Sequence, residues 1–137
     1  MSNNIPSGKT ILWADDDADD LMLMHDVLKE TDQHYEIVEV PNGRKALEYL
    51  KSCTHYPCLI ILDMNMPIMN GQETLSIIKL HEQYKNIPVV VFTTSNSEMD
   101  RVFCKKYGVE MITKPPEYRS FHKIVLKMLN YCDAASS

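Results

Sequence analysis

The sequence predicts an α/β protein in which a five-stranded parallel sheet carries helices on both faces. Five short apolar or β-branched runs occur along the chain, and a segment with helical spacing of apolar residues follows each of them. Strands are expected at 9–14, 35–40, 58–63, 88–93 and 110–113, and helices at 18–31, 43–51, 71–84, 97–107 and 117–131. Parallel strands require helical crossovers, so this alternation favours a single doubly wound sheet.

The first three strands differ in how they distribute apolar residues. The run KTILWA leads into an acidic turn, in which Asp17 is placed to cap the helix that follows. The run YEIVEV alternates apolar and polar residues, which is typical of an edge strand. The run LIIL is continuously apolar, as expected for a strand that helices bury on both faces.

The second half of the chain repeats the pattern. Leu75, Ile78 and Leu80 recur at helical spacing before the continuously apolar run VVVF. Gly108 is well placed to end the fourth helix, because glycine favours the left-handed conformation found after helix ends. The last segment, YRSFHKIVLKML, is amphipathic and is expected to pack one face on the sheet.

Length and charge narrow the class of protein. The 137 residues suffice for one domain with a sizeable core, expected at 9–132 between flexible segments at 1–8 and 133–137. The net charge of −5 and the absence of a Lys/Arg run argue against binding to nucleic acid. No signal peptide or membrane-spanning run is found, so we expect a cytoplasmic protein that does not bind a membrane.

The four cysteines carry no motif. Cys53, Cys58, Cys104 and Cys132 lack the C-x-x-C spacing of a zinc or redox site. We therefore expect free thiols, as is usual in the cytosol.

Acidic residues gather where strands of the sheet end. The stretch DDDADD follows the first strand, and Asp63 ends the third. In such sheets, ligands bind outside the carboxyl ends of the strands. If the first and third strands are neighbours, Asp15, Asp16 and Asp63 form one cluster that calls for a divalent cation, and Mg²⁺ is the natural occupant.

Two further residues predict phosphoryl chemistry at this cluster. Lys114 follows the fifth strand and supplies a positive charge for a phosphate oxygen. Thr93 ends the fourth strand, and its hydroxyl can donate to another phosphate oxygen. Asp63 lies at the centre of this set and is suited to act as a nucleophile that forms an aspartyl phosphate. The nearby Asp19 and Asp20 fall in the first turn of a helix, where the helix dipole favours negative charge.

These residues, taken in order, resemble the receiver domain of two-component response regulators. The resemblance runs from about residue 10 to 129 and rests on the stretches ILWADDD, LIILDMNMPIMNG, IPVVVFTTS and ITKP. It implies a flavodoxin-like (βα)₅ fold with strand order 2-1-3-4-5, dependence on Mg²⁺, and transfer of a phosphoryl group from a histidine kinase or phosphotransfer protein. The stretch IPVVVFTTSNSEMD also looks like regulators paired with phytochrome-type kinases.

The resemblance also assigns roles to the acidic residues. Asp63 corresponds to the phosphoacceptor, and Asp16 to a direct metal ligand, with Asp15 nearby or acting through water. Asn65 would contribute its backbone carbonyl to the metal.

On the other side of the predicted site, the resemblance makes Thr93 the hydroxyl that follows the phosphoryl group, and Lys114 the lysine that binds it. A cis peptide bond is expected before Pro115. The chain departs from the family at Met111, where many receivers carry an aromatic residue, and at Pro116, which makes a double proline.

The resemblance implies a single-domain regulator that signals to a downstream protein target by phosphorylation-dependent contact. The face formed by the predicted elements 97–107, 110–113 and 117–131 is expected to bind a partner or to form a homodimer. Two alternatives are a phosphohydrolase of the haloacid dehalogenase type and a scaffold that works without phosphorylation. A phosphohydrolase of that type requires another aspartate where Asn65 stands. A scaffold of that kind would not need the residues for phosphoryl transfer, yet the acidic pair, Asp63, Thr93 and Lys114 are all present.

Overall fold

The computed structural model describes residues 9–31 and 35–136, the last four by their backbone alone. The predicted flexible segment 1–8 lies outside the described residues. The strands are β1 (Thr10–Ala14), β2 (Glu36–Val40), β3 (Leu59–Leu62), β4 (Val89–Thr93) and β5 (Glu110–Thr113), and the helices are α1 (Ala18–Lys29), α2 (Gly43–Ser52), α3 (Gly71–Leu80), α4 (Glu98–Lys106) and α5 (Tyr118–Ser136). The described residues therefore contain the five strand and helix pairs that the sequence predicts.

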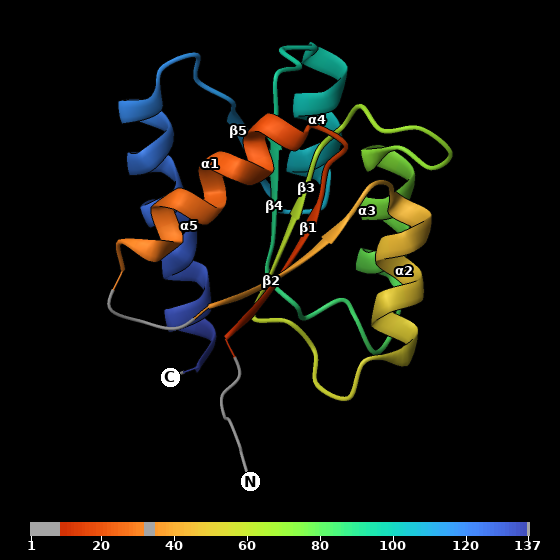
Figure 1. The fold of residues 1–137 in the computed structure, drawn as a ribbon. Helices are drawn as coiled ribbons and strands as arrows, with labels where there is room; N and C mark the ends of the chain where they lie inside the picture. The colour runs from red at the N-terminus through yellow and green to blue at the C-terminus, as the bar shows by residue number, and fades with distance from the viewer. Residues whose placement is uncertain (1–8, 32–34, 137) are drawn as a thin grey trace, which may run out of the picture.

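The five strands form one parallel sheet in the order β2-β1-β3-β4-β5. Helices α1 and α5 lie side by side on one face, and α2 and α3 lie together on the other (Figure 1). This arrangement confirms the predicted flavodoxin-like fold and strand order. Because β1 and β3 are neighbours, with Ala14 opposite Leu62, the residues that follow these two strands leave the sheet at the same edge.

The sheet separates two hydrophobic cores, and successive residues of a buried strand point into different ones. In β3, Ile60 and Leu62 belong to the core beneath α2, α3 and α4, whereas Leu59 and Ile61 belong to the core beneath α1 and α5. All four side chains are buried. The continuous apolar run of β3 is therefore explained, since neither face of the strand meets water.

Two helices end four or more residues away from the ends that the sequence predicts. Helix α3 stops at Leu80 rather than at 84, because His81 turns into an extended conformation and its carbonyl accepts hydrogen bonds from the backbone of Tyr84 and Lys85. The ring of His81 stacks on the ring of Tyr84, with 3.8 Å between their centroids. Helix α5 continues to Ser136, five residues beyond the predicted end at 131.

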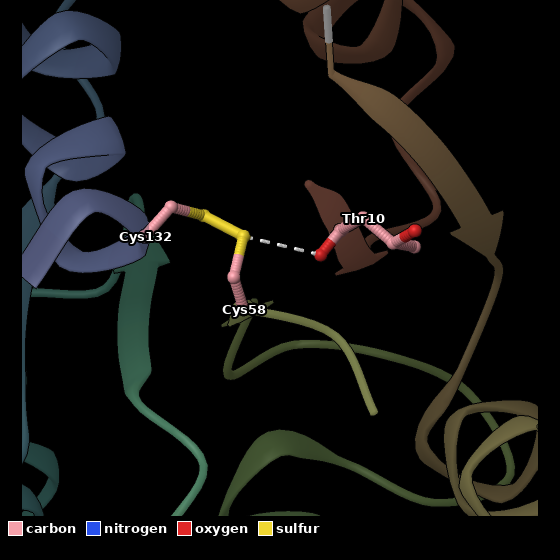
Figure 2. The surroundings of a disulfide bond; sticks show 3 residues. All are labelled: Thr10, Cys58 and Cys132. Atoms are coloured by element: carbon pink, nitrogen blue, oxygen red, sulfur yellow. Dashed lines mark hydrogen bonds between the residues drawn. A yellow bond between two sulfur atoms is a disulfide. The ribbon is translucent and has the colours of Figure 1, made fainter. Parts of the chain in front are cut away.

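The expectation of free thiols is wrong for two of the four cysteines. Cys58, directly before β3, and Cys132, in α5, form a disulfide with 4.8 Å between their Cα atoms (Figure 2). The Sγ atom of Cys58 also lies 3.4 Å from the carbonyl oxygen of Thr10. The two cysteines are 74 residues apart, so their pairing depends on the packing of α5 against the sheet and not on any local spacing.

The remaining cysteines keep free thiols, Cys53 half-buried and Cys104 buried. Burial raises the pKa of the Cys104 thiol to about 11, so this side chain behaves as a small apolar group. Among the described residues, no helix is both long enough and apolar enough to cross a lipid bilayer.

The disulfide gives a first prediction about stability. Cys132→Ser should lower the free energy of unfolding by about 2–4 kcal/mol under non-reducing conditions, because it opens a large covalent loop in the unfolded chain. Urea unfolding with and without a reducing agent measures this loss, and the reducing agent should remove most of the difference between the two proteins. Cys53→Ser, at a cysteine outside the bond, is the matched control. Equal unfolding midpoints for oxidised and reduced wild-type protein would contradict the prediction.

Candidate functional site

The end of β1 and the end of β3 bring three aspartates together. The backbone N–H of Asp63 donates to the carbonyl of Ala14 at 3.0 Å, which fixes the residue after β3 against the end of β1. One carboxylate oxygen from each of Asp15, Asp16 and Asp63 lies within 4.8 Å of the other two. The predicted acidic cluster is therefore present in the structure.

The three carboxylates differ in their access to water. Asp15 and Asp63 are buried, with 3% and 6% of their surfaces exposed, whereas Asp16 is exposed. The backbone N–H of Asp17 donates to Oδ1 of Asp15 at 2.8 Å, and that of Asn65 donates to Oδ1 of Asp63 at 3.3 Å. The cluster thus has a closed floor and one side that opens to solvent at Asp16.

Lys114 supplies the positive charge that the buried carboxylates need. Its Nζ atom lies 2.8 Å from Oδ2 of Asp15 and 3.2 Å from Oδ2 of Asp63, and only 6% of its side chain is exposed. The backbone N–H of Lys114 donates to the carbonyl of Thr93 at 2.8 Å, which holds the residue after β5 beside the end of β4. The structure therefore places Lys114 where the sequence predicts it.

The electrostatics of the site follow from burial and from this lysine. Burial raises the pKa of the Asp15 carboxyl to about 6, and the hydrogen bond and charge of Lys114 offset that effect only in part. Burial alone would lower the pKa of Lys114, but the carboxylates of Asp15, Asp20 and Asp63 outweigh it and hold the pKa above its ordinary value. Lys114 is therefore charged at neutral pH.

Asp20 has a role that the sequence does not reveal. The sequence predicts that Asp20, like Asp19, lies in the first turn of α1, where negative charge interacts favourably with the helix dipole. Both residues do lie there. The Oδ2 atom of Asp20 lies 2.6 Å from Nζ of Lys114, and its side chain is 15% exposed. Asp20 is therefore a third anionic partner of the lysine. Asp17 does cap the helix as predicted, accepting hydrogen bonds from the backbone of Asp19 and Asp20.

Thr93 is buried at the end of β4, and its contact is not with the aspartates. Its Oγ1 atom accepts a hydrogen bond from the backbone N–H of Ser95 at 3.2 Å. Thr93 therefore lies at the predicted edge of the sheet, but it is tied to the loop between β4 and α4.

Gly71 is a second residue whose part in the site the sequence does not reveal. It begins α3, and its backbone N–H donates to the carbonyl of Met64 at 3.1 Å. A Cβ atom at this position would lie 2.4 Å from the carbonyl oxygen of Asp63 and 2.7 Å from Cα of Met64. The helix therefore approaches the backbone of Asp63 so closely that only glycine fits. The sequence signal is a glycine at the start of a helix, directly after a capping asparagine.

The expected cis bond before Pro115 is wrong, because no peptide bond within 9–31 and 35–136 is cis. Met111, which stands where many receivers carry an aromatic residue, is partly buried against the core beneath α2, α3 and α4. Its thioether therefore fills space and brings no hydroxyl group to the site.

The donor set fits a hard divalent cation. The cluster offers carboxylate oxygens only, with no imidazole or thiolate among the described residues that compose it. Oxygen ligands of this kind suit Mg²⁺, Mn²⁺ or Ca²⁺ rather than Zn²⁺, and the carboxylate of Asp16 lies on the open side of the cluster.

Comparison with known proteins agrees with this geometry. The family model for the response regulator receiver domain matches residues 11–126. Response regulator Rcp1 of Synechocystis sp. is 34% identical over 131 residues, which are 91% of this chain and 89% of that protein.

Two solved structures have the same architecture. The phosphorylated cyanobacterial phytochrome response regulator RcpA gives a TM-score of 0.87 at 30% identity, over 96% of this chain and 98% of that chain. The Mn²⁺-bound form of Rcp1 gives a TM-score of 0.81 at 33% identity, over 87% of this chain and 90% of that chain.

The close approach at Gly71 gives a second prediction. Gly71→Ala should lower the free energy of unfolding by about 1–3 kcal/mol, because the added methyl group meets backbone atoms that cannot rotate away. Urea unfolding measures the loss. Leu80→Ala is the control on the same helix, since 73% of Leu80 is exposed and little packing is removed. If Gly71→Ala were as stable as the wild type, the backbone contact would not limit this position.

Proposed function

The chain belongs to the response regulator receiver domain family, and on this premise we propose that it accepts a phosphoryl group on Asp63 and signals through the phosphorylated form. Receiver domains act in two-component signalling, where histidine kinases or phosphotransfer proteins phosphorylate them. The observation that carries the proposal is the buried carboxylate of Asp63, which shares one charged lysine with Asp15 at the open edge of the sheet. A carboxylate in this setting is electrostatically compensated, and it lies next to the side of the cluster that opens to solvent at Asp16.

In the proposed reaction, a carboxylate oxygen of Asp63 forms a bond to phosphorus while the bond from phosphorus to the donor's histidine nitrogen breaks. Asp15, Asp16, Asp63 and the backbone carbonyl of Asn65 would hold Mg²⁺. When bound, the metal supplies positive charge that neutralises the oxygens of the transferring group. The chain catalyses only its own phosphorylation and dephosphorylation in this proposal.

Lys114 and Thr93 stabilise the phosphoryl group once it is in place. Lys114 already contacts Oδ2 of Asp63 at 3.2 Å, so a small movement of its ammonium group brings it to a phosphoryl oxygen. The Thr93 hydroxyl donates to another oxygen. Its position at the end of β4, the strand next to β3, supports this role.

We further propose that the face formed by α4, β5 and α5 binds a downstream protein or a second copy of the chain. Met99 and Val102 on α4 are 78% and 61% exposed, although both are apolar. They line a shallow cavity of about 310 Å³ together with Phe103, and such exposed apolar surface is typical of interaction sites.

Replacement of the phosphoacceptor gives the third prediction. After incubation with acetyl phosphate and Mg²⁺, the intact mass of the wild type should increase by one phosphoryl group. EDTA should abolish the increase, and Asp63→Asn should show none, because an amide oxygen is a poor nucleophile. Asp19→Asn is the matched control, since Asp19 belongs to the same acidic stretch but lies exposed in the first turn of α1. Full labelling of Asp63→Asn would refute the assignment.

Removal of the lysine gives the fourth prediction. Lys114→Ala should accept a phosphoryl group poorly, and without Mg²⁺ it should lose about 3 kcal/mol of stability, because the buried carboxylates lose their counter-charge. Mg²⁺ should stabilise this variant more than the wild type, since the cation then replaces the missing charge. Urea unfolding with and without Mg²⁺ measures both effects. Lys85→Ala, at an exposed lysine paired with Glu82, is the control. An equal stabilisation by Mg²⁺ in Lys114→Ala and the wild type would contradict the prediction.

A further inference from the structure

Three polar side chains from different elements meet beside the candidate site. Asp100 lies in the first turn of α4, Ser95 in the loop between β4 and α4, and Gln72 in the first turn of α3. The Ser95 hydroxyl donates to Oδ2 of Asp100 at 2.6 Å, and Nε2 of Gln72 donates to Oδ1 of Asp100 at 2.5 Å. We call these three residues the Asp100 clamp. All three are half-buried, so water competes only partly for these hydrogen bonds.

The clamp fixes the backbone that contacts Thr93. Besides donating to Asp100, the Ser95 hydroxyl oxygen accepts a hydrogen bond from the backbone N–H of Ser97 at 3.2 Å. The Ser95 side chain is therefore held from two sides. Its own backbone N–H donates to Oγ1 of Thr93 at 3.2 Å, so the position of Ser95 determines where the Thr93 oxygen is held.

This arrangement leaves the Thr93 hydroxyl hydrogen available. In the part of the chain that the structure describes, the Thr93 oxygen accepts from Ser95, and no side chain or carbonyl accepts from the hydroxyl. A hydroxyl whose oxygen is already engaged as an acceptor has its hydrogen restricted to the remaining directions. The Ser95 contact therefore limits how Thr93 can donate.

The charge on Asp100 strengthens the clamp. Both of its carboxylate oxygens accept from neutral donors, and hydrogen bonds to an ionised acceptor are shorter and stronger than neutral ones. Its position in the first turn of α4, where Ser97 caps the helix and accepts from the Asp100 backbone, also favours negative charge. A strong polar contact thus joins the starts of two helices to the loop that holds Thr93.

We propose that Asp100 and Gln72 are positioning residues for the phosphoryl site, acting through Ser95 on the hydroxyl of Thr93. The proposal rests on the proposed function, in which Thr93 donates to the phosphoryl group. Neither Asp100 nor Gln72 belongs to the acidic cluster, so they should affect binding of the phosphoryl group and not binding of the metal alone.

The experiment compares two affinities in each variant: that for Mg²⁺ alone and that for beryllofluoride, an aspartyl-phosphate mimic, in saturating Mg²⁺. Asp100→Asn should weaken beryllofluoride binding about fivefold, roughly the effect of 1 kcal/mol in hydrogen bonding, and leave Mg²⁺ affinity unchanged. The reason is that the neutral amide keeps only one acceptor oxygen, and its hydrogen bonds to Ser95 and Gln72 are weaker than those of the ionised carboxylate. Isothermal titration calorimetry measures both affinities, and Glu98→Gln, in the same turn of α4, is the matched control.

A double variant tests the hydrogen-bond pattern itself. Combining Asp100→Asn with Gln72→Glu reverses donor and acceptor, so beryllofluoride affinity should return to near the wild-type value. If it stays as weak as in Asp100→Asn alone, or if Asp100→Asn weakens Mg²⁺ binding in equal proportion, the clamp is only a structural tether and the proposal is wrong.

A third variant tests the same link in case Asp100→Asn folds poorly. Ser95→Ala keeps the backbone N–H that donates to Thr93 but removes the hydroxyl that ties residue 95 to Asp100, while Gln72 and Asp100 keep their contact. It should show the same selective loss of beryllofluoride affinity. An unchanged affinity in Ser95→Ala would overturn the proposal. Failure of the wild type to bind beryllofluoride in Mg²⁺ or to gain a phosphoryl group would instead overturn the proposed function, so the two failures are distinguishable.

Discussion

The arrangement of the site depends on the ion pairs that the ammonium group of Lys114 forms. It contacts carboxylates that come from the end of β1, from the first turn of α1 and from the end of β3, while its own backbone follows β5. Burying two aspartates side by side is unfavourable unless a positive charge compensates them. One lysine therefore links three strands and a helix, and it keeps the carboxyl edge of the sheet polar without making it unstable.

This requirement explains why the strand order matters to the chemistry. Because β3 lies between β1 and β4, Asp63 emerges with an acidic neighbour on one side and the hydroxyl of Thr93 at the end of the strand on the other. The same central strand is tied at its opposite end, where Cys58 is bonded to Cys132 of α5. The element that carries the proposed phosphoacceptor is thus fixed at both ends, by backbone pairing at one edge and by a covalent bond at the other.

Much of this could be predicted from the sequence, because the relevant signals are local or follow from the parallel sheet. Continuous apolar runs such as β3 indicate buried strands, and the rule that parallel strands end at one edge predicts the cluster of Asp15, Asp16 and Asp63. The pairing of Asp20 with Lys114 is not predictable in this way, since it depends on which side chain in the first turn of α1 lies beside that lysine. The disulfide likewise requires knowledge of which part of α5 lies against the start of β3, and no local pattern carries that information.

The alternation of side chains between the two cores has a consequence for how the sequence can change over evolutionary time. Substitutions beneath α1 and α5 can be compensated there without disturbing the packing beneath α2 and α3, because the sheet separates the two cores. A single-residue insertion or deletion inside β1, β3 or β4 is different, since it would exchange the two sets of side chains and turn the residue after the strand away from its partners. Among homologous chains, length variation should therefore fall in the loops on the edge away from Asp63, and the three central strands should keep a constant number of residues.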